Sequence, residues 1–168
     1  MVDRVRHLAH LVARFVTSLL PRPPSAAGIA RVRAILTPGE LAVWEAMPRA
    51  DRVEAIATLE RLPPDVAADD RWAAAALLHD AGKQVSGLGT FGRTLTTLRG
   101  VIQGRDHVRG RAGAYLHHPA LGARLLESAG ARPEAVAWAA THHERDRWPR
   151  DVIPEPVCEA LARADGET

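Results

Sequence analysis

The stretch WAAAALLHDAGK, residues 72–83, joins a run of alanines and leucines to His79, Asp80 and Lys83. The apolar run predicts a buried helix that spans about 70–81 and ends at the glycine of this stretch. Burying an imidazole, a carboxylate and an ammonium costs free energy unless the groups are paired or bind an ion. The last turn of this helix is therefore predicted to form one wall of a polar site.

Length and composition are those of an ordinary globular domain. The 168 residues suffice for one domain with a sizeable core, and the fractions of hydrophobic (46%) and charged (25%) residues are typical. The formal net charge of +2 is too small to indicate nucleic acid as a specific partner. A single cysteine, Cys158, excludes an internal disulfide and a cysteine-rich metal site, so we expect a cytoplasmic protein.

Lysine is almost absent from the sequence. Of the 22 basic residues only Lys83 is a lysine, which leaves 21 arginines. The compact ammonium of lysine differs chemically from the planar guanidinium of arginine. The position four residues after His79 is therefore interpreted as one that requires a lysine, with chance as the alternative.

The first twenty residues predict an amphipathic helix. Its apolar positions recur at helical spacing and are Val5, Leu8, Leu11, Val12, Phe15, Val16 and Leu19. Arg14 interrupts the apolar stretch, which is too short to span a bilayer. We expect helix 1–20 to pack on its own domain or on a partner, such as a second copy of the chain. A helix on a membrane surface is the alternative. The stretch PRPPSAAG, 21–28, predicts a linker to a main domain at 29–168.

The sequence of the main domain predicts helices over almost its whole length. Residues 29–36 predict a short helix. Thr37, Pro38 and Glu40 then match a capping box, with the threonine as N-cap and the proline at the first helical position. Further helices are predicted at 51–62, 94–102, 118–130, 133–145 and 154–165. Strand signals are nearly absent, so the predicted fold class is an all-α bundle.

Several histidines fall at the ends or beginnings of predicted helices. They are His79, the pair His117 and His118, and the pair His142 and His143, and Asp165 ends the last helix. Imidazole nitrogens and carboxylate oxygens suit divalent transition metals such as manganese, iron, nickel or zinc. Adjacent helical residues diverge by about 100°, so His79 and Asp80 converge only on an ion between them, and Asp80 could bridge two ions. One His-Asp pair is usually incidental, but such groups on separate helices favour a metal site.

Four motifs carry a resemblance to a known family. They are LLHDAGK (77–83), HHPALGARLL (117–126), ATHHER (140–145) and LARAD (161–165). With them the chain resembles the HD-domain metal-dependent phosphohydrolases over about residues 45–166, and LLHDAGK matches their HD-x-GK signature. The second and third motifs are similar to the HD-GYP variant, which includes cyclic-dinucleotide phosphodiesterases. RDRWPRD stands where GYP is expected, so that specificity is not transferred.

The resemblance implies an HD-type helical bundle and a role for each matching residue. The implied metal ligands are His79, Asp80 and Asp165 at a first site, and His118, His142 and His143 in additional coordination. His117 is an alternative to His118. These ligands would hold one or two divalent transition ions. Lys83 would contact a phosphate or the attacking water and, with Asp80, would be catalytic.

The sequence departs from this family at one ligand. The family supplies a first histidine on a helix well before the HD pair, but this chain has no histidine between positions 10 and 79. Glu54 is predicted to replace it as a metal ligand, with Asp51 one turn earlier as the alternative. A carboxylate there would favour harder ions. The equal alternative is a solvated Glu54 that pairs with Arg52 or Arg61.

We therefore expect a metal-dependent phosphohydrolase that acts on a nucleotide or a related small phosphoester. The missing histidine favours the main alternative, a degenerate member of the fold that binds a ligand or partner without turnover. Six other implied ligands and Lys83 oppose that alternative. A third class is oxidative cleavage by a di-iron form of the scaffold, which dioxygen-dependent turnover would reveal.

Overall fold

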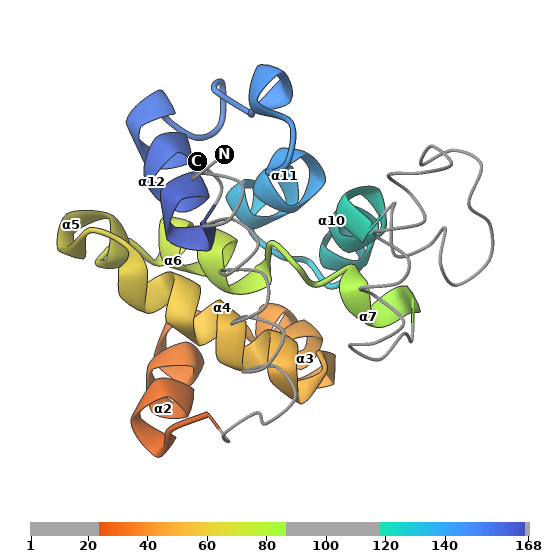
Figure 1. The fold of residues 1–168 in the computed structure, drawn as a ribbon. Coiled ribbons are helices and arrows are strands. Elements are labelled where there is room, and N and C mark those ends of the chain that lie inside the picture. The colour runs from red at the N-terminus through yellow and green to blue at the C-terminus, as the bar shows by residue number, and fades with distance from the viewer. Residues whose placement is uncertain (1–23, 87–117, 167–168) are drawn as a thin grey trace, which may run out of the picture.

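The structure, a computed structural model, describes residues 24–86 and 118–166, and every regular element within them is a helix (Figure 1). The elements are α2 (Ala26–Ile35), α3 (Pro38–Ala46), α4 (Arg49–Arg61), α5 (Pro64–Ala67), α6 (Asp70–Leu78), α7 (Lys83–Ser86), α10 (His118–Ser128), α11 (Pro133–Thr141), the 3-10 turn η2 (Arg145–Arg147) and α12 (Glu155–Asp165). The all-α fold class is thus confirmed. The helices predicted at 1–20 and 94–102 lie outside the described residues. In the described part, no helix has the length and apolar character needed to cross a lipid bilayer.

Side-chain caps determine where the first described helices begin. The Gly28 N–H donates to Ser25 Oγ at 3.0 Å, so α2 begins at Ala26 and the last residues of the stretch 21–28 are helical. The capping box is confirmed, because the Thr37 N–H donates to Glu40 Oε2 at 2.9 Å and the Glu40 N–H donates to Thr37 Oγ1 at 3.4 Å. These bonds satisfy N–H groups that a helix start otherwise leaves free.

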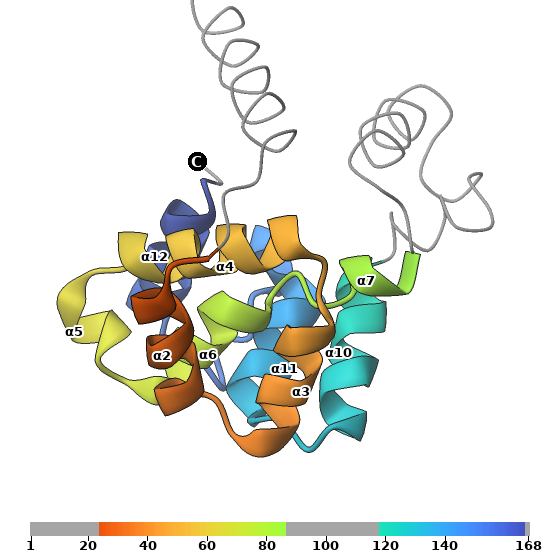
Figure 2. The ribbon, with the colours of Figure 1, turned by 90° about the horizontal axis from the view of Figure 1, so that it is seen from below.

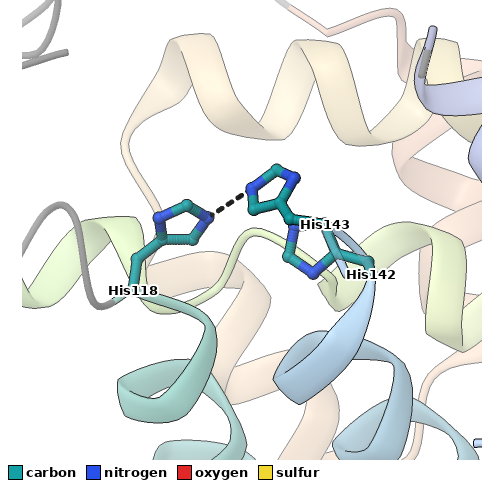
Figure 3. A group of neighbouring side chains, drawn as sticks. All are labelled: His118, His142 and His143. Carbon is teal, nitrogen blue, oxygen red and sulfur yellow. Dashed lines mark hydrogen bonds between the residues drawn. The ribbon is translucent and has the colours of Figure 1, made fainter. Parts of the chain in front are cut away.

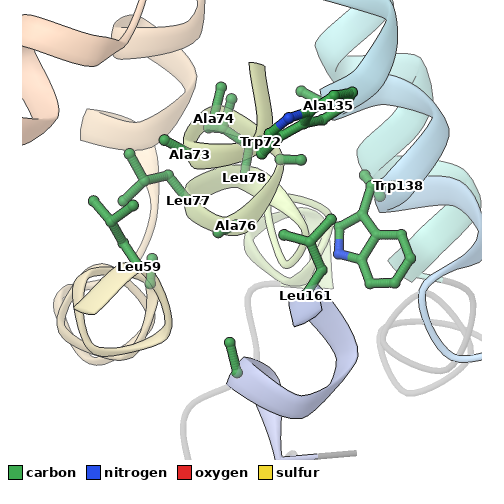
Figure 4. Close-up of a cluster of buried hydrophobic side chains, with 14 of the residues drawn as sticks. Leu59, Trp72, Ala73, Ala74, Ala76, Leu77, Leu78, Ala135, Trp138 and Leu161 are labelled. Atoms are coloured by element: carbon green, nitrogen blue, oxygen red, sulfur yellow. The ribbon is translucent and has the colours of Figure 1, made fainter. Parts of the chain in front are cut away.

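Helix α6 lies at the centre of the bundle, between α4, α11 and α12 (Figures 1 and 2). Residues 72–78 are all buried, and none of them is more than 8% exposed. The small alanines let the neighbouring helices approach, and Leu59, Trp138 and Leu161 belong to the same buried cluster (Figure 4). A helix that is apolar on every side belongs in a core. This position confirms the buried helix predicted from the alanine-leucine run.

The end of α6 differs from the prediction. The helix ends at Leu78, and the backbone continues through residues 79–82 in tight turns. In these turns the Ala81 N–H donates to the Leu78 carbonyl and the Lys83 N–H donates to the Asp80 carbonyl, both at 3.0 Å. The first of these i→i+3 bonds uses a carbonyl that the end of α6 leaves free. The polar residues of the motif therefore lie on and just beyond the end of the helix.

Gly82 has a different role from the helix stop expected of it. It is buried, and a Cβ atom added to it would overlap the backbone of His118 and lie 2.6 Å from the Gly122 backbone nitrogen. Both neighbours belong to α10. The absence of a side chain at Gly82 therefore lets α10 pack directly on the turn after α6, which brings His118 beside that turn.

A buried ion pair joins α3 to the beginning of α11. The Glu40 side chain is 0% exposed, and its carboxylate accepts hydrogen bonds from the Arg132 backbone N–H (2.9 Å), Nε (2.9 Å) and Nη2 (2.6 Å). Burial disfavours the charged carboxylate, but these bonds, with that from Thr37, outweigh burial and lower the pKa of Glu40 to about 2. The pair thus joins two helices that both pack against α6.

We expect Glu40→Gln to lower the free energy of unfolding by about 3 kcal/mol at pH 7. The pKa of Glu40 lies below its ordinary value of 4.5, so the charged form stabilises the fold above about pH 4.5, and this contribution is lost as the pH falls toward 2. The difference in stability between the wild type and the variant should therefore shrink over that range in urea titrations. Glu45→Gln is the control, because its pair with Arg33 is exposed and spans 3.6 Å, and should change stability by less than about 1 kcal/mol. Equal effects of the two variants would contradict the assignment.

Candidate metal centre

Four helix ends bring the predicted site residues together. His79 follows α6, His118 begins α10, His142 follows α11, and Asp165 ends α12. The ring centroids of His79 and His142 lie 5.2 Å apart, and those of His118 and His142 lie 5.7 Å apart. Side chains from four separate segments therefore share one site next to the core.

Asp80 lies at the middle of this site, and its two carboxylate oxygens face different neighbours. Oδ2 lies 3.4 Å from His79 Nε2 and pairs with the Lys83 ammonium. Oδ1 lies 3.4 Å from His118 Nε2 and 3.9 Å from His142 Nε2. The residue is 8% exposed. Its carboxylate therefore separates two groups of candidate ligands while contacting both.

The first group, which we call the first cluster, consists of His79, Asp165 and the Oδ2 side of Asp80. His79 Nε2 lies 3.2 Å from Asp165 Oδ1. The His79 side chain is 2% exposed and that of Asp165 is 15% exposed. One imidazole nitrogen and two carboxylate oxygens thus face one another in a nearly dry environment.

The second group, the three-histidine cluster, consists of His118, His142 and His143 (Figure 3). One ring nitrogen of each lies within 4.8 Å of those of the other two. His118 Nε2 and His143 Nε2 lie 3.2 Å apart, a distance that suits a shared proton or an ion held nearby by both rings. His118 and His142 are buried and His143 is exposed, so the cluster meets solvent at His143.

Backbone carbonyls orient two of the histidines. His79 Nδ1 lies 2.9 Å from the Ala76 carbonyl, and His142 Nδ1 lies 3.2 Å from the Ala139 carbonyl. A carbonyl oxygen only accepts, so Nδ1 carries the proton in both rings, and Nε2 has the free lone pair when the ring is neutral. In both rings Nε2 is the atom that faces Asp80. This is the arrangement of histidines that bind metals through Nε2.

The donor atoms fit a bound cation. Within 24–86 and 118–166, His79 Nε2, His142 Nε2 and Asp80 Oδ1 are buried yet have no hydrogen bond of good geometry. Buried polar atoms are normally hydrogen bonded, and these three lie close to one another. Nitrogen and carboxylate donors together suit divalent manganese, iron, nickel or zinc. Metal ions bound in the two groups would give all three atoms a partner.

The charges of the site set the protonation state of each candidate ligand. Burial opposes protonation of His79, but Asp80 and Asp165 outweigh burial and raise the pKa of His79 to about 9. Burial also opposes ionisation of Asp80, but Lys83 and His79 hold the pKa of that carboxyl well below its usual range. Burial and the charge of His79 lower the pKa of His142 well below 6.5. At neutral pH Asp80 is thus ionised and His142 neutral, as metal ligands must be, whereas His79 carries a proton on Nε2 that a bound ion would displace.

Glu54 forms an ion pair with Arg61, which the sequence analysis gave as the alternative to a role as a metal ligand. Both terminal nitrogens of Arg61 donate to Glu54 Oε1 at 3.2 Å. That Glu54 itself is a ligand stays a prediction, as does the alternative ligand Asp51, which lies half-buried in the first turn of α4. His117 lies outside the described residues.

The sequence analysis missed two contributors to the site. Gly82 was interpreted only as a helix stop, although the glycine of the HD-x-GK signature was a signal that the backbone passes close to another segment. Arg61 was named only as a partner for Glu54, although it also bonds to the backbone next to Asp165. No sequence signal separates this arginine from the other twenty.

Comparison with known proteins gives one match. The family model described as HD domain matches residues 51–166, which is more than half of the chain and includes both clusters. No curated protein and no solved structure gives a significant match.

Proposed function

This chain belongs to the HD-domain family, and we propose that it is a metal-dependent phosphohydrolase that acts on a nucleotide or a related small phosphoester. The observation that carries the proposal is the position of the Asp80 carboxylate, with one oxygen toward His79 and the other toward His118 and His142. A carboxylate placed in this way can bridge two divalent ions. The proposed ligands are His79, Asp80 and Asp165 in the first cluster, and His118, His142 and His143 in the other.

A divalent ion bound there would supply Lewis acidity to the phosphoester and favour ionisation of the attacking water near neutral pH. The chain's own residues hold the charges that this chemistry needs. Asp80 and Asp165 offset positive charge at the first cluster, and the Nδ1 bonds of His79 and His142 keep their rings oriented. Exposed His143 marks the side from which a substrate would approach.

Lys83 is proposed to stabilise the phosphoryl group. Its ammonium pairs with Asp80 Oδ2, and its side chain is 20% exposed. An ammonium has three donors, so Lys83 can keep its bond to Asp80 while it donates to a phosphoryl oxygen. Fixed positive charge beside that oxygen favours the transition state over the ground state.

Turnover by the full chain and by Lys83→Arg tests the proposal. The probes are p-nitrophenyl phosphate, bis(p-nitrophenyl) phosphate and a panel of nucleotides with Mn²⁺. We expect metal-dependent hydrolysis by the wild type. Lys83→Arg should lower kcat about 10- to 100-fold with unchanged metal content, because a planar guanidinium cannot take the place of the ammonium.

The control is Arg124→Lys, a matched exchange at an exposed position of α10, which should leave kcat unchanged. Equal kcat for Lys83→Arg and the wild type would remove Lys83 from the mechanism. A chain that binds metal but hydrolyses none of the probes would favour the degenerate, ligand-binding alternative, which the absent first histidine supports. Turnover that requires dioxygen would indicate the oxidative alternative instead.

Three further predictions complete the proposal. The protein is proposed to be cytoplasmic. Its chain is proposed to divide into an amphipathic helix at 1–20, a linker at 21–28, whose last residues begin α2, and the helical domain at 29–168. The amphipathic helix is proposed to join copies of the chain into a homo-oligomer.

A further inference from the structure

We propose that Arg61 is a positioning residue for Asp165, which it holds through the backbone of α12, and that Glu54 keeps Arg61 in place. The inference rests on the proposed function, because Asp165 is one of the proposed ligands of the first cluster. It gives Glu54 a role in the site that does not require direct contact with a metal.

The central contact joins the end of α4 to the end of α12. Arg61 is the last residue of α4, and its Nη1 donates to the Ala164 carbonyl at 2.8 Å. Ala164 immediately precedes Asp165. The guanidinium is thus bonded to the peptide group that connects these two residues, although 103 positions separate the arginine from the alanine.

This bond extends the cap of α12. The last four carbonyls of a helix have no partner within the helix. The N–H of Gly166, which has a φ of 87°, serves the carbonyls of Ala162 and Arg163. Arg61 serves the next carbonyl, that of Ala164, and places positive charge at the negative end of the helix. The turn that carries Asp165 is therefore held from two sides.

Glu54 restrains the guanidinium that makes this bond. It lies seven residues before Arg61 on α4, which is two turns along the same face. Both Nη atoms of Arg61 donate to Glu54 Oε1 at 3.2 Å, while the Arg61 side chain is 46% exposed. An arginine this exposed loses much of its conformational freedom when it is held in one geometry. Because the Glu54 carboxylate already restricts Arg61, less freedom is lost when Arg61 forms its hydrogen bond to α12.

The position of Asp165 matters because its Oδ1 lies 3.2 Å from His79 Nε2. Two ligand atoms must lie at a defined distance from each other to bind the same ion. Replacement of a residue that orients a ligand typically changes metal affinity about 10- to 100-fold. Contacts thus run from Glu54 through Arg61 to the Ala164 carbonyl, and from the neighbouring Asp165 to His79.

Binding of Mn²⁺ to the metal-free full chain, measured by isothermal titration calorimetry, tests the proposal. Arg61→Ala should raise the Kd at the first cluster about tenfold, and Arg61→Lys, which keeps a positively charged donor at this position, should recover part of the affinity. The control is Arg163→Ala, which removes an exposed arginine from the same end of α12, where it pairs only loosely with Glu159 (3.8 Å). Thermal midpoints of the same samples separate weak binding from unfolding. An unchanged Kd for Arg61→Ala would overturn the proposal.

A double-mutant cycle assigns the role of Glu54. If Glu54 acts through Arg61, Glu54→Ala should weaken Mn²⁺ binding in the wild type but cause no further loss in Arg61→Ala. A further tenfold loss in the double variant would overturn this role and favour Glu54 as a direct ligand.

Hydrogen exchange of the metal-free chain supplies a test that needs no metal. Arg61→Ala should speed exchange of the backbone amides of residues 164–166, and Arg163→Ala should not. Unchanged exchange in Arg61→Ala would overturn the proposal even if the wild type bound no Mn²⁺, a result that would count separately against the proposed function.

Discussion

Asp80→Ala is expected to abolish tight metal binding, with a loss of affinity of at least about 100-fold. Asp80 directs one carboxylate oxygen toward each cluster, so its removal deprives each of an anionic oxygen. It also leaves the positive charges of Lys83 and His79 close together without the carboxylate between them. Elemental analysis of the purified variant, and titration with Mn²⁺, would measure the loss.

Two further variants make this test specific. Asp80→Asn keeps the size of the side chain but removes its charge and replaces one acceptor oxygen by an NH2 donor. It should fold even if the alanine variant does not, and it should also lose tightly bound metal. Asp70→Ala replaces an exposed aspartate at the opposite end of α6 and should bind metal as the wild type does. An unchanged metal content in Asp80→Asn would refute the assigned role.

Gly82→Ala is expected to lower the free energy of unfolding by about 3 kcal/mol and to weaken metal binding at the three-histidine cluster. The added methyl group would overlap the backbone of His118 and approach that of Gly122. Backbone atoms of a packed helix cannot rotate away as a side chain can, so α10 must shift. That shift would move His118 away from Asp80 and His143. Chemical denaturation and Mn²⁺ titration would measure the two effects.

The matched control is Gly28→Ala, which places a methyl group inside α2. There the nearest atoms belong to the side chains of Ser25 and Ile56, at 3.1–3.3 Å, and none to the backbone. Alanine also favours a helix over glycine by about 1 kcal/mol, so the net change should be within about 1 kcal/mol. If Gly82→Ala were as stable and bound metal as well as Gly28→Ala, the close approach of α10 would have no importance for the site.

Much of the fold was predictable because local chemistry and burial agree along the chain. The capping box at Thr37 and Glu40 depends only on residues three apart, so the sequence predicts it fully. The run 72–78 is apolar at every position, and only a core helix can bury all of its faces. The end of α6 and the beginning of α2 were less predictable. Single backbone hydrogen bonds determine the first, and the Ser25 cap determines the second.

The candidate site was predictable in its composition but not in its arrangement. Histidines at helix ends indicated ligands on separate segments, and the HD-domain resemblance related them to one another. The division into two clusters depends on the direction of each Asp80 oxygen, which only the packing of α6, α10 and α11 determines. The contact of Arg61 with Ala164 links residues 103 positions apart, and no local pattern in the sequence encodes it.

Anomalous diffraction from crystals of the full chain grown with Mn²⁺ would test the central claim most directly. The account predicts anomalous peaks at bonding distance, about 2.0–2.2 Å, from Asp80 and from Nε2 of His79 or of His118 and His142. Peaks only at other positions, or crystals with no ion near Asp80 at saturating Mn²⁺, would contradict it.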